Sequence, residues 1–174
     1  MKIYLAPVKF SNSALLSSVR KDIVHVFNEV DIINIDLNID EAYSKEREQY
    51  FSTQIISEAI KKTDGFKGKI IILTDVDLYI PVLTFIFGEA QLNGKHSIVS
   101  VCRLHEEFYS EKTNEFLLNK RTIKEILHEL GHNFGLKHCI NWDCVMHSST
   151  SIEEVDIKGG SYCRECGEKI KNYN

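Results

Sequence analysis

The sequence lacks the features that mark membrane-spanning, secreted and nucleic-acid-binding proteins. No window approaches the roughly 18 apolar residues of a membrane-spanning helix. The first ten residues, MKIYLAPVKF, hold only a short apolar run that Pro7 interrupts, and no small-residue cleavage site of a secretory signal follows. No long basic run occurs, and the net charge of −4 gives no attraction to nucleic acid or to an anionic membrane. We therefore expect a cytoplasmic protein that binds neither.

Internal repeats and low-complexity segments are also absent. A chain of 174 residues is long enough for one hydrophobic core and too short for two typical domains. We therefore expect a single domain over residues 1–174, and we expect it to be a monomer.

Hydrophobic periodicity predicts alternating strands and helices. Strands are expected at residues 2–8, 30–39, 69–74, 84–88 and 97–104, and helices at residues 13–27, 40–62 and 120–134. Residues 105–114 are expected to form a loop, and the chain beyond Gly135 is expected to be irregular. This order predicts an α/β sandwich with a mixed sheet of about five strands.

The run HELGHNFGLKHC contains the most specific chemical pattern in the chain. His128 and His132 are four residues apart, so on a helix both imidazoles lie on one face and reach one metal ion. Gly135 can end the helix in a left-handed conformation, and the returning chain then supplies His138. Three histidines leave one position of a tetrahedral zinc open for substrate chemistry. Glu129 lies beside that position, where it can take a proton from water and pass it to a leaving amine.

An ordinary amphipathic helix with surface or core histidines is the simpler alternative. The short pattern HExxH occurs by accident often enough to support that interpretation. The longer pattern HExxHxxGxxH fixes five positions, however, and it favours a zinc site.

Four cysteines cluster after the histidines, at positions 139, 144, 163 and 166. Two short-spaced pairs about twenty residues apart are typical of a closed, structural zinc site with four thiolate ligands. Such a site would hold down a C-terminal segment that has few apolar residues. Disulfides and a redox CxxC are alternatives, although a reducing compartment disfavours the first and no thioredoxin-like strand and helix flank the second. Cys102 lies in a predicted strand and is expected to be a small buried hydrophobe.

The histidine run followed by Met146 resembles the metzincin clan of zinc peptidases, and the four cysteines make the chain similar to the archaemetzincin branch. The stretches TDVDLYIP and FIFGEA, residues 74–81 and 85–90, also look like that family. The resemblance implies a compact metzincin-like sandwich with an active-site helix, one catalytic zinc and one structural zinc. It makes Glu129 the general base and Met146 the methionine below the metal, and it gives the catalytic zinc to His128, His132 and His138. It assigns the structural zinc to Cys139, Cys144, Cys163 and Cys166.

Two functions fit these features. The first is a zinc-dependent peptidase, in which the strand near residues 84–88 borders the cleft and pairs with an extended peptide substrate. The second is a two-zinc module that binds peptide, or has a structural role, with little or no turnover. Glu129 favours the first, because a purely structural site does not need that carboxylate.

Overall fold

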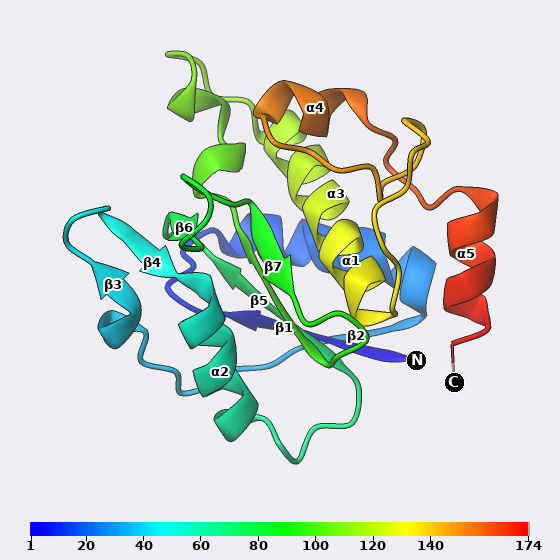
Figure 1. The fold of residues 1–174 in the computed structure, drawn as a ribbon, viewed down its shortest axis with the longest axis horizontal. Coiled ribbons are helices and arrows are strands. Elements are labelled where there is room, and N and C mark those ends of the chain that lie inside the picture. Colours follow the sequence, from blue (N-terminus) through cyan, green and yellow to red (C-terminus); the bar gives the residue numbers. More distant parts are fainter. Residues whose placement is uncertain (174) are drawn as a thin grey trace.

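A five-stranded sheet lies at the centre of the fold. The computed structural model describes residues 1–173 and is shown in Figure 1. The strand order is β2-β1-β5-β8-β7, with bounds β1 Lys2–Pro7, β2 Glu29–Ile32, β5 Lys69–Thr74, β7 Gly88–Ala90 and β8 His96–Ser100. The first four strands in this order are parallel, and β7 runs antiparallel to β8 at one edge. The predicted mixed sheet of about five strands is confirmed.

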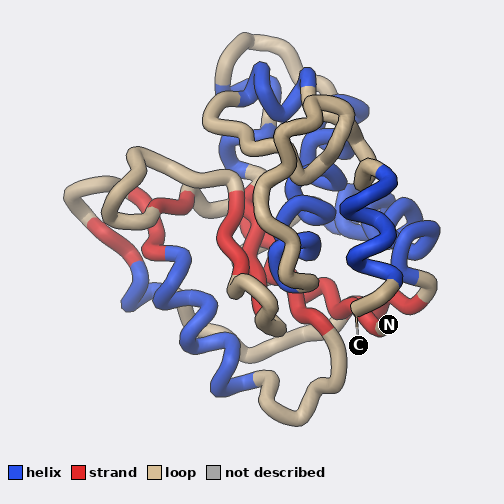
Figure 2. The backbone as a smooth tube through the Cα atoms, turned by 45° about the vertical axis from the view of Figure 1, so that its right-hand side comes forward, coloured by secondary structure: helices blue, strands red, loops and turns tan. Residues whose placement is uncertain are grey.

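Helices cover both faces of this sheet. Helices α1 (Ser13–Phe27) and α3 (Glu115–Asn133) pack on one face, and α2 (Ser52–Lys62) packs on the other, as Figure 2 shows. Because successive residues of a strand point to opposite faces, β5 supplies both cores. Ile71 and Leu73 contact the side of α1 and α3, whereas Ile70 and Ile72 contact the side of α2. This explains why the run KIIILT is apolar throughout.

The prediction of one helix over residues 40–62 is wrong in its first half. A short 3-10 helix, Asp40–Ala42, leads into strands β3 (Tyr43–Ser44) and β4 (Gln49–Phe51), and only then does α2 begin. Strands β3 and β4 join β6 (Leu78–Tyr79) in a second, three-stranded sheet. Tyr43 and Tyr50 make a cross-strand contact between β3 and β4, with their ring centroids 5.0 Å apart.

Other predicted boundaries shift. Strand β2 ends at residue 32 rather than 39, and the edge strand is Gly88–Ala90 rather than residues 84–88. Strand β8 ends at Ser100, and the half-buried Cys102 begins a 3-10 helix, Cys102–Leu104. A second 3-10 turn, Glu106–Phe108, lies in the predicted loop 105–114.

The C-terminal third is more regular than predicted. Helix α3 begins five residues early because the Asn114 side chain accepts a hydrogen bond from Leu117 N and caps the helix. Beyond Gly135 the chain forms two short helices, α4 (Ile152–Ile157) and α5 (Arg164–Lys171). Within residues 1–173, no helix combines the length and apolar character needed to cross a bilayer.

His96 in β8 is expected to make the protein sensitive to acid. Burial, assisted by the neighbouring Lys95, lowers the pKa of His96 from 6.5 to about 4. Below pH 6.5 the unfolded chain therefore binds a proton that the folded chain excludes, so stability falls until pH reaches about 4. We expect the free energy of unfolding of the wild type to fall faster than that of a His96→Gln variant, by about 1.4 kcal/mol per pH unit in this window.

Urea unfolding at several pH values between 7 and 4 measures this difference. The exposed His25 on α1 provides the matched control, and a His25→Gln chain should follow the wild type. Parallel pH curves for the wild type and His96→Gln would show that residue 96 is not the sensitive group.

Candidate active site

The end of α3 brings three histidines to one point. The helix stops at Gly135, whose φ of +80° lies in the left-handed region that glycine adopts at low cost. Leu136 N donates to Gly131 O across this turn, at 2.9 Å. The chain then runs back along the helix, and His138 comes to lie beside His128 and His132.

The three imidazoles fit one tetrahedral metal ion. The ligand nitrogens of His128, His132 and His138 all lie within 4.8 Å of one another. The Nε2 atoms of His128 and His132 are 3.2 Å apart, close to the roughly 3.3 Å expected for two nitrogens on one tetrahedral zinc. Burial decreases along the series, with His128 buried, His132 half-buried and His138 exposed. The cluster therefore opens to solvent on the side of His138.

Hydrogen bonds fix the orientation of two of these rings. His128 Nδ1 donates to Val145 O and His132 Nδ1 donates to Leu136 O, each at 2.8 Å. Both bonds leave Nε2 free as the ligand atom. Burial lowers the pKa of His128 to about 2 and also lowers the pKa values of His132 and His138, with the charge of Lys158 acting in the same direction. The rings are therefore neutral at physiological pH, which is the form that binds a metal.

Glu129 lies beside the histidines at the wall of a cleft of about 830 Å³. The residues of β7 also line this cleft, and Gly88 makes room for the carboxylate. A Cβ on residue 88 would lie 2.8 Å from both Cγ and Oε1 of Glu129. The next residue, Glu89, points the other way and accepts hydrogen bonds from the hydroxyls of Ser52 and Thr53 at the start of α2. Burial raises the pKa of Glu129 well above its usual range, and a cation held by the neighbouring imidazoles would favour the ionised carboxylate.

Two oppositely charged side chains that form an ion pair also line this cleft. Glu125 is one helical turn before Glu129, and its Oε1 lies 2.8 Å from Nζ of Lys158. The side chain of Lys158 is 0% exposed and that of Glu125 is 5% exposed. The charge of Lys158 favours the ionised form of Glu129, and the charge of Glu125 opposes it. The pair thus places opposite charges beside the candidate catalytic carboxylate.

Met146 lies against the helix that carries His128 and His132. It is fully buried and packs directly on α3 at Gly131, where an added Cβ would lie 2.2 Å from the methionine sulfur. Its predicted position below the metal stays a prediction.

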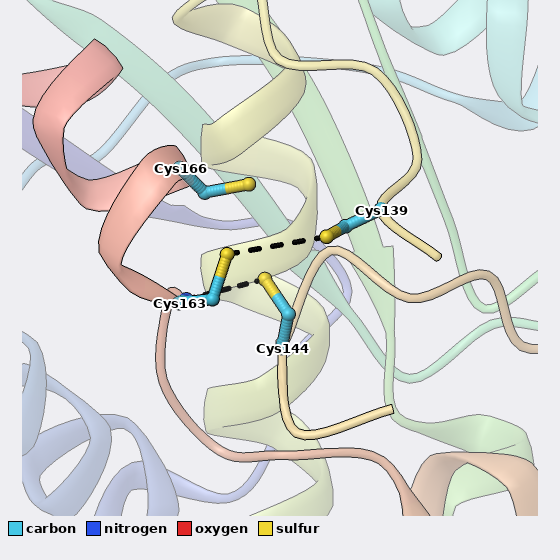
Figure 3. Close-up of side chains that lie close together, drawn as sticks. All are labelled: Cys139, Cys144, Cys163 and Cys166. Atoms are coloured by element: carbon cyan, nitrogen blue, oxygen red, sulfur yellow. Dashed lines mark hydrogen bonds between the residues drawn. The ribbon is translucent and has the colours of Figure 1, made fainter. Parts of the chain in front are cut away.

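The four clustered cysteines converge on a second point, as Figure 3 shows. Cys139 and Cys144 come from the segment that follows α3, whereas Cys163 and Cys166 come from the start of α5. All four sulfurs lie within 4.8 Å of one another. The sulfurs of Cys139 and Cys163 are 3.9 Å apart, close to the roughly 3.8 Å expected for two thiolates on one tetrahedral zinc. All five cysteines of the chain are free thiols, so the disulfide alternative is not realised.

Burial raises the pKa values of Cys144 and Cys166. A cation among the sulfurs would therefore be needed to hold all four as thiolates at neutral pH. This donor set suits zinc, which prefers thiolate and imidazole ligands.

The structure brings together all seven predicted metal-binding residues and places Glu129 among the histidines. Glu125 and Lys158 also line the cleft, and neither was predicted from the sequence. Glu125 carried a signal, because it lies four residues before Glu129 on the same helix face. Gly88 ends the predicted strand 84–88, which the family resemblance placed at the border of the cleft. Lys158 carried no signal, since only tertiary packing brings it there.

Comparisons with known proteins agree on one family. The model of peptidase family M54 matches residues 15–172. The archaemetzincin of Methanocaldococcus jannaschii is 39% identical over 173 residues, covering 99% of this chain and 94% of the relative. Among solved structures, an archaemetzincin from Archaeoglobus fulgidus in complex with malonate aligns with a TM-score of 0.83 at 35% identity, covering 97% of this chain and 99% of that one. A zinc-dependent peptidase from Methanocorpusculum labreanum aligns with a TM-score of 0.86 at 28% identity, with the same coverage.

Proposed function

The chain belongs to peptidase family M54, the family of the archaemetzincins, and on this premise we propose that it cleaves peptide bonds at the histidine cluster. In this proposal His128, His132 and His138 hold a catalytic zinc, and Glu129 is the general base. The observation that carries it is the convergence of three neutral imidazole nitrogens beside a buried carboxylate that faces an open cleft.

The zinc, when bound, supplies Lewis acidity that polarises the scissile carbonyl and makes water a nucleophile at neutral pH. Glu129 takes the proton of the attacking water and passes it to the nitrogen of the leaving amine. Its position supports this role, because the absence of a side chain on Gly88 leaves space between β7 and α3. The hydrogen bonds to Val145 O and Leu136 O keep the first two imidazoles in the required tautomer.

Peptide substrates follow from the family, and β7 is the proposed binding edge. It is the last strand of the sheet and borders the cleft beside Glu129. An extended peptide can add to such an edge through main-chain hydrogen bonds. This places a scissile bond between β7 and the end of α3.

The cysteine cluster is proposed to hold a second, structural zinc. Its four thiol ligands leave no position open for substrate, and they join α5 to the segment after α3. Free thiols gathered for a metal also suit a reducing compartment such as the cytoplasm. We further propose that the chain is one domain and acts as a monomer.

The alternative is a module that binds peptide and two zinc ions without turnover. Glu129, and the space that Gly88 leaves for its side chain, favour the peptidase, because neither feature is needed to hold a metal. Hydrolysis of a peptide library by the zinc-loaded chain separates the two functions.

Chelation is expected to remove the two zinc ions at different rates. We predict about two zinc per chain, with the histidine site emptied first because it is open to solvent and has only three protein ligands. Cleavage of library peptides should stop when the first zinc is lost. Zinc analysis and peptide hydrolysis, sampled together during chelation, measure this order. A total of one zinc, or equal loss of both, would contradict the two-site assignment.

A further inference from the structure

The segment of residues 144–147, which we call the bridging segment, contacts both donor clusters. Cys144 supplies one of the four sulfurs. The next residue, Val145, accepts the hydrogen bond from His128 Nδ1. Met146 O accepts from Cys139 N, and His147 Nδ1 donates to Cys139 O, each at 2.9 Å. Since Cys139 follows His138 directly, these last two bonds set the position of the third histidine.

The second half of the cysteine cluster holds the bridging segment from the other side. Val145 N donates to Ser161 O at 2.9 Å, and Cys163 N donates to the sulfur of Cys144 at 3.3 Å. Figure 3 shows Cys163 facing Cys144 across the gap between the two chain segments. A metal ion bound by the four sulfurs would fix these segments together, and with them the carbonyl of Val145.

His132 differs from the other two histidines in this respect. Its Nδ1 bonds to Leu136 O, four residues along the chain and within the turn that ends α3. The bridging segment therefore holds the ring of His128 and the backbone that follows His138, whereas the ring of His132 is held at the helix end. A change that affects His128 and leaves His132 unaffected would therefore come through the bridging segment, whereas a general loss of folding would affect both histidines.

We propose that metal binding at the cysteine cluster preorganises the histidine site, so that the cysteines fill first and strengthen zinc binding by the histidines. The inference rests on the proposed function, in that both clusters are taken as zinc sites. Groups that orient metal ligands typically change metal affinity by about 10- to 100-fold, and we expect a coupling of that size.

Zinc affinity of the histidine site in the full-length chain tests the proposal. Competition with a chromophoric chelator would be measured in the wild type and in a Cys163→Ser/Cys166→Ser chain, which keeps all three histidines. We expect the dissociation constant of the histidine site to rise by about 10- to 100-fold in the double variant. An unchanged constant would overturn the proposal.

A measurement on the wild type covers the case in which the cysteine variant does not fold. NMR of the imidazole Nδ1–H protons would be recorded for metal-free protein and after one equivalent of zinc. We expect this first equivalent to protect the proton of His128 from exchange and to leave that of His132 unchanged. Equal protection in the metal-free and one-zinc forms would overturn the proposal.

His147→Ala removes one link and keeps all seven donors. We expect it to reduce the coupling, whereas His25→Ala, at an exposed position on α1, should preserve it. If the cysteine cluster still strengthens zinc binding by the histidines to the full extent in His147→Ala, the hydrogen bond from His147 to Cys139 O has no role in the coupling. A wild type that binds a single zinc would overturn both this inference and the proposed function, and two zinc ions with independent affinities would overturn this inference alone.

Discussion

A Glu129→Gln chain is expected to lose peptide hydrolysis by about 10²- to 10⁴-fold in kcat while it keeps its zinc. Glutamine has the same shape as glutamate, so it fits the space opposite Gly88 without disturbing β7. It cannot accept a proton from water, however, and the attacking nucleophile stays protonated. Zinc content should not change, because Glu129 is not one of the three proposed zinc ligands, which are all histidines. Steady-state kinetics on a cleaved library peptide, with zinc analysis of the same sample, measure both quantities.

Glu115 supplies the matched control, since it is an exposed glutamate on the first turn of the same helix. Glu115→Gln should cleave at the wild-type rate. A Glu129→Gln chain that holds zinc and cleaves as fast as the wild type would remove Glu129 from the mechanism. If the zinc-loaded wild type cleaves no peptide at all, the binding-module alternative becomes the better description.

The apolar pattern of the sequence correctly predicted the helices and strands that contact the core along their whole length. Helix α1 matches the predicted residues 13–27, and β5 matches residues 69–74. In both cases the apolar pattern is set by a continuous core contact on one or both sides. The sequence therefore contains enough information to place these elements without knowledge of the rest of the chain.

The region 40–62 shows where local patterns fail. Tyr50 and Phe51 have helical spacing relative to the isoleucines of α2, yet they pair with Leu78 and Tyr79 of β6. That partner strand is nearly thirty residues away and only two residues long. No periodicity in the sequence marks such a pairing, because a two-residue strand is shorter than one period of alternation plus its flanks.

The candidate site divides in the same way. The histidines and cysteines were predictable because zinc ligands follow short, fixed spacings that can be recognised along the chain. The ion pair near Glu129 was not, because Lys158 comes from a loop that is distant in sequence from Glu125 and Glu129. Ligand identity is thus mainly a local property here, while the electrostatics of the cleft depend on the whole fold.

Removal of the Lys158 charge is expected to cause a large loss of stability. A Lys158→Met chain would leave the carboxylate of Glu125, 5% exposed, buried without its cation. Loss of one partner of a buried pair typically costs about 3–5 kcal/mol, much of it from the unpaired charge that remains. We therefore expect the free energy of unfolding to fall by about that amount. Urea unfolding of zinc-loaded protein measures it, and Lys21→Met, at an exposed position on α1, is the control.

The double variant Glu125→Gln/Lys158→Met separates charge from packing. If the unpaired carboxylate causes the loss, removing it as well should restore most of the stability, because a buried ion pair and neutral residues of similar volume often differ little. If the double variant is no more stable than Lys158→Met, the fit of the lysine side chain against α3 is the main contribution. In the first case the ion pair contributes little net stability, and its main effect is on Glu129. There the charge of Lys158 lowers the pKa and the charge of Glu125 raises it.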